Sequence, residues 1–513
     1  MGETQHGFGI LDWLIVAGYM AGMVGVGALT SRRQQDTDTY FLGGRQMPVW
    51  AVALSVLATS LSAATFIGAP QIAYEGNLTY LSLNIGGMIA AFVVAFLFIP
   101  PIYRAGTTTI YGYLGKRYGP PSMMAASAMF LFGRLLASGA RLFMAGIGFA
   151  LILYGDTTPR ELVMAVVLLG FVGTLYTAFG GIRAVIWTDT IQIVVVTFAA
   201  GLSVYLLLDA IPLSTPQITA VLRDANGVDK LKLIDTRLAL GPSFTLWAAV
   251  IASTFVSTSA YGVDHDLAQR MMTVKSPWRG GAALIGSTLL GIPVIFLFLV
   301  IGLLLSIYYG RPDLMGDAAP LDAVADTKRI YPQFLLNHVP LGLRGLAMAG
   351  LFAAAMSSFD SAINAMASTA VADLYIPWKA WRIRQTGAGT PPEASLTASR
   401  FAVAAMGALL TCFAILAVFL QAKGNDTLIG FALGVMAFAL APLLGVFSAA
   451  IFTRRGNTAS VFAALGLGMG AVLLLQPYAL QAWLDFELGW PWWWVVVTPF
   501  SFLLCIAGRS MHT

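Results

Sequence analysis

The sequence predicts an all-α polytopic membrane protein, and its composition and its long apolar runs carry that prediction. The chain of 513 residues is 58% hydrophobic, carries only 10% charged residues and contains 53 glycines. A soluble globular protein typically carries about 25% charged residues, and glycine is more frequent in transmembrane helices than in soluble ones. Long apolar runs recur along the whole chain. These features predict many membrane-spanning helices rather than several soluble domains.

The apolar runs divide the chain into thirteen candidate spans. A spanning helix needs about 20 mainly apolar residues, and runs of this kind lie near 11–30, 49–75, 79–103, 122–154, 161–179, 185–209, 243–263, 280–308, 341–373, 398–421, 427–451, 457–476 and 490–508. The first run is predicted to be a retained helix rather than a signal peptide, because no lysine or arginine precedes it and it is long enough to span.

Loop charge predicts how these spans are oriented. Of the 29 lysines and arginines, seventeen fall on one side of the thirteen spans and ten on the other, and two, Arg134 and Arg141, fall within a span. Loops rich in lysine and arginine stay in the cytoplasm. We therefore expect a multi-pass protein of the plasma membrane, the inner membrane in a bacterium, with its N-terminus outside and its C-terminus cytoplasmic. The net charge of +5 then reflects topology and not affinity for nucleic acid.

Little in the sequence predicts catalysis or a bound transition metal. Cys412 and Cys505 lie inside apolar runs, with neither a disulfide framework nor metal-ligand spacing. Only one of the four histidines, His265, neighbours acidic residues, and no nucleophile motif or phosphate-binding loop is present. We therefore expect that the protein is not an enzyme and that it binds neither a transition metal nor an organic cofactor. A membrane-embedded enzyme and a passive channel are the distant alternatives. The tryptophans at 490 and 492–494 predict an interfacial aromatic belt.

Small polar residues interrupt the second predicted span. Four hydroxyl residues, Gly68 and Pro70 fall within Ala58 to Pro70. Such residues let a helix break, and a broken helix frees backbone carbonyls that can bind a cation where they line a cavity. Close packing against another helix is the alternative, and the sequence leaves both open.

A second set of polar residues forms one helical face in the ninth span. Ser357, Asp360, Ser361 and Asn364 follow i, i+3, i+4, i+7 spacing, so they share a face. Hydroxyls with one carboxylate suit a hard cation that takes oxygen ligands, and sodium fits better than a transition metal because no imidazole or thiolate is near. The alternative is hydrogen bonding between helices.

Three more charged residues lie in or near predicted spans. Asp189 follows a turn predicted at Gly180–Gly181. The alternative to a functional role is that it is an ordinary aspartate near the membrane surface at the start of a helix. Arg134 and Arg141 are two helical turns apart on roughly one face. Either arginine can clamp a substrate carboxylate, pair with Asp189 or Asp360, or extend to the membrane surface, and the sequence does not decide among these.

Four motifs, in the right order on the right spans, resemble the sodium:solute symporter family. They are Leu61-Ser62-Ala63-Ala64-Thr65-Phe66, the stretch from Gly180-Gly181 through Trp187-Thr188-Asp189 to Gln192, Asp264-His265-Asp266-Leu267-Ala268-Gln269-Arg270, and Met356-Ser357-Ser358. The likeness runs from Phe41 to about residue 451. It implies a leucine-transporter-like core of two inverted five-helix repeats, 49–209 and 243–451. An N-terminal helix and loop (1–48), an extracellular loop (210–242) and two C-terminal helices (452–513) complete the chain.

The resemblance also implies binding residues. A main sodium site would use the backbone carbonyls of Ala58, Leu61 and Ala354 with the hydroxyls of Ser357 and Ser358. A second sodium site would use Asp189, Ser357, Asp360 and Ser361, where Asp360 departs from the hydroxyl-only pattern of the family. Likeness to the sialic-acid branch, with the iodide and monocarboxylate branch next, implies that substrate meets Ser60, Ser62, Thr65, Tyr80, Asn84, Arg134 and Phe255. Asp266 and Arg270 would lie in a cytoplasmic loop.

By this resemblance the chain imports a small organic solute by sodium symport. A carboxylate such as sialic acid or a monocarboxylate is the first expectation, and a sugar or other neutral solute is the alternative. Sodium is the coupling ion, and the expected partners are the solute and the lipid bilayer, with no nucleic acid. We expect the chain to act as a monomer.

Overall fold

The computed structural model describes residues 8–31, 36–225, 227–316, 327–386, 395–421, 427–476, 479–480 and 488–509, and within them the regular structure is helical. The first half contains α1 (Ile10–Ser31), α2 (Thr37–Leu42), α3 (Val49–Ser60), α4 (Ala63–Glu75), α5 (Leu83–Val93), α6 (Ile99–Arg104), α7 (Tyr111–Tyr118), α8 (Pro120–Tyr154), α9 (Pro159–Ala210) and α10 (Thr215–Arg223). The second half contains α11 (Ser253–Gly262), α12 (His265–Met271), α13 (Pro277–Tyr308), α14 (Pro312–Met315), α15 (Ile330–Asn337), α16 (Leu343–Thr369), α17 (Ile376–Thr386), α18 (Leu396–Gln421), α19 (Thr427–Phe452), α20 (Thr458–Leu474) and α22 (Trp492–Ala507). The predicted all-α class is confirmed.

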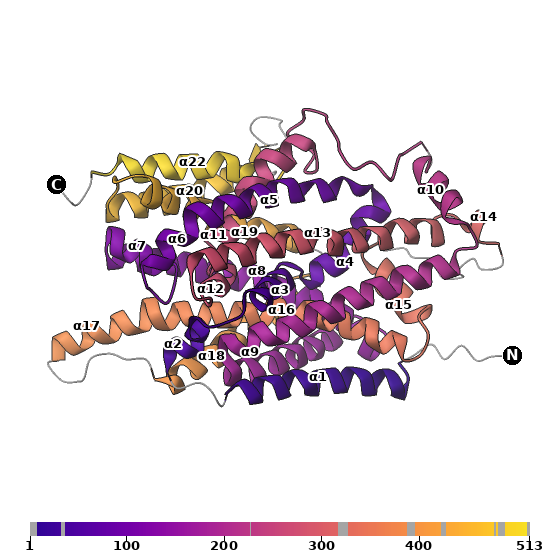
Figure 1. Ribbon diagram of the computed structural model, residues 1–513, viewed down its shortest axis with the longest axis horizontal. Coiled ribbons are helices and arrows are strands. Elements are labelled where there is room, and N and C mark those ends of the chain that lie inside the picture. The colour runs from indigo at the N-terminus through magenta and orange to yellow at the C-terminus, as the bar shows by residue number, and fades with distance from the viewer. Residues whose placement is uncertain are drawn as a thin grey trace.

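The long helices run along the long axis of the molecule and form one bundle (Figure 1). Short helices cap its ends: α7 and the end of α17 lie at the end that holds the C-terminus, and α10 and α14 lie at the opposite end. Many apolar side chains on the outer helices are exposed, such as Leu14 at 64% and Phe171 at 63%. An exterior of this kind is compatible with lipid and not with water.

Each of the thirteen predicted spans falls on helix, although fewer helices of the described chain qualify as spans by length and composition. Seven are long and apolar enough to cross a membrane, or up to eight if one bent pair counts as a span. The difference of six has three causes. Two predicted spans share α9, and the segments 49–75 and 243–263 meet breaks. The stretch Met436–Phe452 of α19, together with α20 and α22, counts only as a shorter apolar helix of at most 17 residues.

The predicted turn at Gly180–Gly181 divides α9. Gly181 has φ 55° and ψ −163°, a conformation that a residue with a side chain rarely adopts. The Arg183 guanidinium then donates to the carbonyl of Gly43 through Nε at 3.1 Å and Nη2 at 2.9 Å. These two hydrogen bonds hold the beginning of the second half of α9, which carries Asp189, against the segment that contains Gly43.

Helix α16 is the centre of the bundle. In its most apolar stretch 94% of residues are buried, against 17% in α1. Gly350 lets it approach α9 closely, since an added Cβ would lie 2.6 Å from the Cβ of Ala199. Buried Asp12 of α1 caps its first turn, accepting hydrogen bonds from the backbone N–H of Gly342 at 2.8 Å and Gly345 at 2.7 Å. A carboxylate at a helix N-terminus satisfies orphan N–H groups and favours the helix dipole, so α1 holds α16 in place.

The tryptophan cluster does not form the predicted aromatic belt. Trp492, Trp493 and Trp494 are only 9%, 4% and 3% exposed, and they pack against interior residues of α19, α20 and the turn of π-helix before α11 (Ala248–Ala252). The prediction is wrong for these three because α22 lies against other helices on the face that carries them. Trp490, by contrast, is 39% exposed.

Candidate functional site

The second predicted span is broken where the small polar residues lie. Helix α3 ends at Ser60 and α4 begins at Ala63, with Leu61 at φ −91°, ψ 99° and Ser62 at φ −95°, ψ 171°. Both residues are in the extended region, so the hydrogen-bond ladder stops and the carbonyls of the last turn of α3 lose their helical partners. Of the two alternatives that the sequence left open, the helix break is present, and the backbone oxygen of Ala58 becomes available to another helix.

Helix α16 supplies that partner. The Ser357 hydroxyl donates to the carbonyl of Ala58 at 3.0 Å and to that of Ala354 at 3.2 Å, and the Ser358 hydroxyl donates to the Ala354 carbonyl at 3.2 Å. All four residues are buried, and Leu61, also buried, lies at the break itself. Four of the five oxygens predicted for the main sodium site are therefore joined by direct contacts. Oxygens from carbonyls and hydroxyls are the ligands that a hard cation prefers.

A buried arginine occupies the neighbouring group of polar residues. Arg270 donates through Nε to the Ser55 hydroxyl at 2.8 Å and through Nη2 to Asp189 Oδ2 at 3.1 Å. The same Nη2 donates to the Ser361 hydroxyl. Asp189 and Ser361, both predicted for a second sodium site, thus meet around a guanidinium group.

The prediction that Asp266 and Arg270 lie in a cytoplasmic loop is wrong. Helix α11 ends at Gly262 and α12 begins at His265, with Asp264 as its N-cap, whose carboxylate accepts from the backbone N–H of Asp266 at 3.1 Å. Arg270 and Asp266 are 0% and 1% exposed. Arg270 Nη1 donates to the Asp266 carboxylate at 3.1 Å. A hydropathy window could not see this helix because charged residues lower its average.

Asp360 faces hydroxyl groups. The Tyr176 hydroxyl donates to Asp360 Oδ2 at 2.6 Å, and the Ser361 hydroxyl to Oδ1 at 3.3 Å. Asp360 is fully buried, and no salt bridge joins it to a basic group among the described residues. The Ser357 hydroxyl, also predicted for the second site, is directed to Ala58 and Ala354 instead.

Arg134 pairs with neither Asp189 nor Asp360. Its guanidinium forms ion pairs with Asp264 and, at 2.9 Å, with Asp266. Arg134 is only 4% exposed. Arg141, seven residues further along α8, makes no hydrogen bond or ion pair with another described residue. It interacts with Asp264 and Asp266 only through longer-range electrostatic attraction.

Two of the predicted substrate residues, Tyr80 and Asn84, line a cavity of about 190 Å³. Its remaining walls come from α5, α11, α13 and the two residues just before α22. The lining residues are Tyr80, Leu83, Asn84, Gly87, Ser253, Val256, Ser257, Tyr261, Ile295, Trp490 and Pro491. Aromatic and small polar side chains dominate, and none of these described residues is an acid, a lysine, an arginine or a histidine.

The other predicted substrate residues do not line this cavity. Ser60 is exposed and its hydroxyl donates to the carbonyl of Val56 at 2.8 Å. Ser62 is buried and Thr65 half-buried at the start of α4. Phe255 packs beside Val256 against the cluster that holds Trp493 and Trp494.

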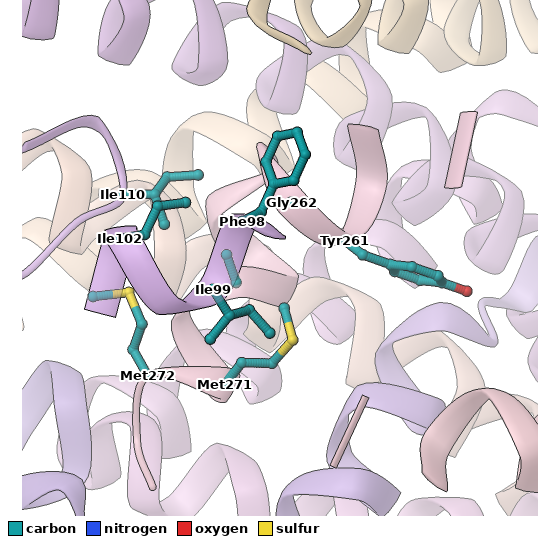
Figure 2. Close-up of a pocket in the computed structure, with 9 residues that line it drawn as sticks. Phe98, Ile99, Ile102, Ile110, Tyr261, Gly262, Met271 and Met272 are labelled. Atoms are coloured by element: carbon teal, nitrogen blue, oxygen red, sulfur yellow. The ribbon is translucent and has the colours of Figure 1, made fainter. Parts of the chain in front are cut away.

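A second, apolar pocket lies beyond Tyr261. It measures about 10 Å³, which leaves room for about one water molecule at most. Figure 2 shows Met271, Met272, Ile99, Ile102 and Phe98 around it, while the Tyr261 ring is directed away from the other side chains. Tyr261 lines both this pocket and the larger cavity.

Three residues that bond to Asp189, Asp360 or Ser361 were not predicted from the sequence as site residues. They are Ser55, Tyr176 and Arg270. Ser55 and Tyr176 gave no signal, because a lone hydroxyl inside a span is ordinary. The sequence did contain a signal for Arg270, because it follows Asp266 by four residues, which is the spacing of an ion pair within a helix.

A family model decides the class of protein. The model described as "Sodium:solute symporter family" matches residues 40–468. The chain belongs to the sodium:solute symporter family.

Curated relatives of this symporter match along most of its length. The sodium/sialic acid symporter SiaT of Proteus mirabilis is 27% identical over 91% of this chain and 90% of its own. The sodium/sialic acid symporter NanT of Aliivibrio fischeri is 28% identical over 92% of this chain and 89% of its own. The human sodium/iodide cotransporter is 28% identical over 91% of this chain and 69% of its own.

Solved structures with the same fold are leucine-transporter-like transporters, as predicted. One, a substrate-bound outward-open state of a Na⁺-coupled sialic acid symporter, has a TM-score of 0.81 and 24% identity over 98% of each chain. Another, the nucleobase-cation symporter Mhp1 in a closed conformation, has a TM-score of 0.57 and 15% identity over 91% of this chain and 92% of its own.

Proposed function

We propose that this symporter imports a small organic solute with sodium bound between the α3–α4 break and α16. The site would consist of the carbonyls of Ala58, Leu61 and Ala354 and the hydroxyls of Ser357 and Ser358. The observation that carries the proposal is the Ser357 hydroxyl, which lies 3.0 Å from the Ala58 oxygen and 3.2 Å from the Ala354 oxygen. It joins helices about 300 residues apart in the sequence at the point where one of them is broken.

Sodium at this place would couple ion binding to solute binding. An ion that touches both α3 and α16 favours the arrangement in which the two lie together, and a ligand shifts a conformational equilibrium by its differential affinity. The membrane potential adds about 2.3 kcal/mol per charge for each 100 mV. We propose that the alternation involves the repeats at 49–209 and 243–451, with the N-terminus outside and the C-terminus in the cytoplasm of a plasma or bacterial inner membrane. The chain then needs neither catalysis nor an organic cofactor, and it works as a monomer.

A carboxylate is the first candidate for the solute. The named sialic-acid symporters among the relatives support this class. Arg134 already forms ion pairs with two aspartates. Of the two arginines within the span, Arg141 is therefore the one whose planar guanidinium group remains able to bind a carboxylate. Tyr80 and Asn84 would contact the solute from the cavity, with Ser60, Ser62, Thr65 and Phe255 joining them when the site closes.

A neutral solute is the second candidate, and the cavity favours it. Its lining contains hydroxyl, amide and aromatic groups and no basic side chain. At about 190 Å³ it is also below the roughly 300–1,000 Å³ of pockets for drug-sized ligands. A neutral sugar such as glucose also fits the observed volume of about 190 Å³ better than the larger sialic acid does.

A thermal-shift screen separates these candidates. The purified full-length protein would be heated with sialic acid, lactate or glucose, each in sodium and in potassium. We expect stabilisation by at least one acid, in sodium only, because a solute that binds the folded state raises its stability in proportion to occupancy. The variant Arg141→Leu should lose the acid's effect.

The control is Arg384→Leu, an exposed arginine on α17, which should keep that effect. Stabilisation by glucose alone would contradict the carboxylate assignment and support the neutral one. An equal shift in potassium would contradict the sodium site itself.

A further inference from the structure

Helix α17 carries exposed aromatic and basic side chains and buries none of its residues. Trp378 is 48% exposed and Trp381 56%, and Tyr375, just before the helix, is 39% exposed. In water, exposed rings of this size give up the hydrophobic gain of burial. Tyrosine and tryptophan gather at the membrane–water interface, where an apolar ring and a polar group each meet a suitable environment. The exposed rings of α17 therefore indicate a place in the headgroup layer.

The length of the helical stretch leads to the same place. Helix α16 continues through a π-helix (Ala370–Tyr375) into α17, and the whole stretch Leu343–Thr386 has 44 residues. At 1.5 Å per residue it is roughly 66 Å long, whereas a bilayer including its headgroups is about 40–45 Å thick. The stretch therefore extends beyond the membrane. In Figure 1, α17 projects past its neighbours at the end that holds the C-terminus.

Four side chains at the start of this projection share one face. Tyr375, Trp378, Lys379 and Arg382 follow i, i+3, i+4, i+7 spacing. The ring centres of Tyr375 and Trp378 lie 6.2 Å apart, and the guanidinium carbon of Arg382 lies 5.6 Å from the centre of the Trp378 ring. A guanidinium at this distance is attracted to the ring. Trp378 thus positions Arg382 on the face that also carries Lys379.

The two cations of this face have no acidic partner. Neither Lys379 nor Arg382 forms an ion pair with another described residue. The sequence from 374 to 386 contains no aspartate or glutamate. Asp373, the acid that precedes this stretch, is buried and bonded to hydroxyl groups. The positive charge is therefore available to a ligand from outside the chain.

We propose that the face formed by Tyr375, Trp378, Lys379 and Arg382 binds the phosphate of an anionic phospholipid. The lipid supplies the negative charge that the face lacks, and a guanidinium fork matches phosphate oxygens. Basic residues at the membrane surface attract anionic lipids, and the two rings add contact with the lipid below its phosphate. Because α17 continues α16, the lipid is bound to the helix whose serines form part of the proposed sodium site.

Equilibrium binding of tritiated phosphatidylglycerol to the purified full-length protein in a neutral detergent tests this site. The label that elutes with the protein on a short gel-filtration column measures binding. Unlabelled phosphatidylglycerol should displace it, and phosphatidylcholine should need roughly 10-fold more, because its headgroup carries no net charge. Each cation removed should weaken binding about 5-fold, so Lys379→Gln with Arg382→Gln should weaken it about 30-fold. Trp378→Ala should weaken it roughly 2- to 5-fold.

Arg384→Gln is the matched control. Arg384 has the same charge on the same helix and is exposed, but it lies two residues from Arg382 and so on another face. It should weaken binding far less than Arg382→Gln does. Because α17 buries no residue, these substitutions spare the core of the protein.

Three results would overturn the site. Equal weakening by Arg384→Gln and Arg382→Gln would show attraction to diffuse charge and not to one face. Displacement by phosphatidylcholine as readily as by phosphatidylglycerol would show that the headgroup charge is not recognised. Displacement by an equal concentration of inorganic phosphate would show a site for a free anion and not for a lipid. The measurement involves neither sodium nor solute, so its result is independent of the proposed symport.

Discussion

Ser358→Ala is expected to abolish sodium-dependent uptake while the protein is made at its normal level. The hydroxyl of Ser358 lies 3.2 Å from the Ala354 carbonyl and supplies one of five proposed sodium ligands. A contact between an ion and a neutral polar group is worth roughly 1.5–3 kcal/mol, so its loss weakens sodium binding about 10- to 100-fold. Uptake of labelled solute against sodium concentration, in cells with matched expression, measures this.

The fold should tolerate this change. Alanine is the best helix former, and the hydroxyl removed bonds only to the helix's own backbone. Ser203→Ala is the matched control, since Ser203 is also buried, donates to a backbone carbonyl at 2.9 Å and lies outside the site. Uptake that is undiminished in Ser358→Ala would refute the assignment of the main sodium site.

Arg270→Met is expected to cause the largest loss of stability. The guanidinium is fully buried, and it bonds to Ser55, Ser361, Asp189 and Asp266. Removing one partner of a buried ion pair leaves an uncompensated charge and costs about 3–5 kcal/mol. The melting temperature of the purified protein, followed by size-exclusion fluorescence, should fall sharply.

Two further variants separate charge from packing in that experiment. Arg384→Met removes an exposed arginine of α17 and should leave the melting temperature unchanged. Adding Asp189→Asn to Arg270→Met removes the charge that the arginine balanced, so it should restore part of the loss. A double variant no more stable than Arg270→Met alone would show that Arg270 acts through packing.

Most of the proposed main sodium site could be predicted from the sequence because the features that indicate it are local. Ala58 to Pro70 concentrates helix-breaking residues, and the break lies within that stretch at Leu61 and Ser62. The face from Ala354 to Asn364 follows helical spacing, and its helix lies at the centre of the bundle. Both features depend on neighbours in the sequence, which hydropathy and periodicity detect.

What the sequence could not supply is which distant groups meet. Arg270 looked like a loop residue because the charges of α12 lower its hydropathy, yet the short helix α12 holds it in the buried interior. Arg134 had several candidate partners, and its pairing with Asp264 and Asp266 depends on how α8 lies against the start of α12. The sequence of Trp492 to Trp494 matches an interfacial pattern, but in the structure their side chains are buried against neighbouring helices.

Gradient-driven uptake tests the central claim most directly. The full-length protein would be placed in liposomes, and entry of whichever of labelled sialic acid, lactate or glucose stabilises it would be followed with an inward gradient of sodium or of potassium. Sodium-coupled symport predicts accumulation above the external concentration with sodium only, and exchange against unlabelled solute inside. Equal entry under potassium, or entry that never exceeds equilibrium and shows no exchange, would contradict it.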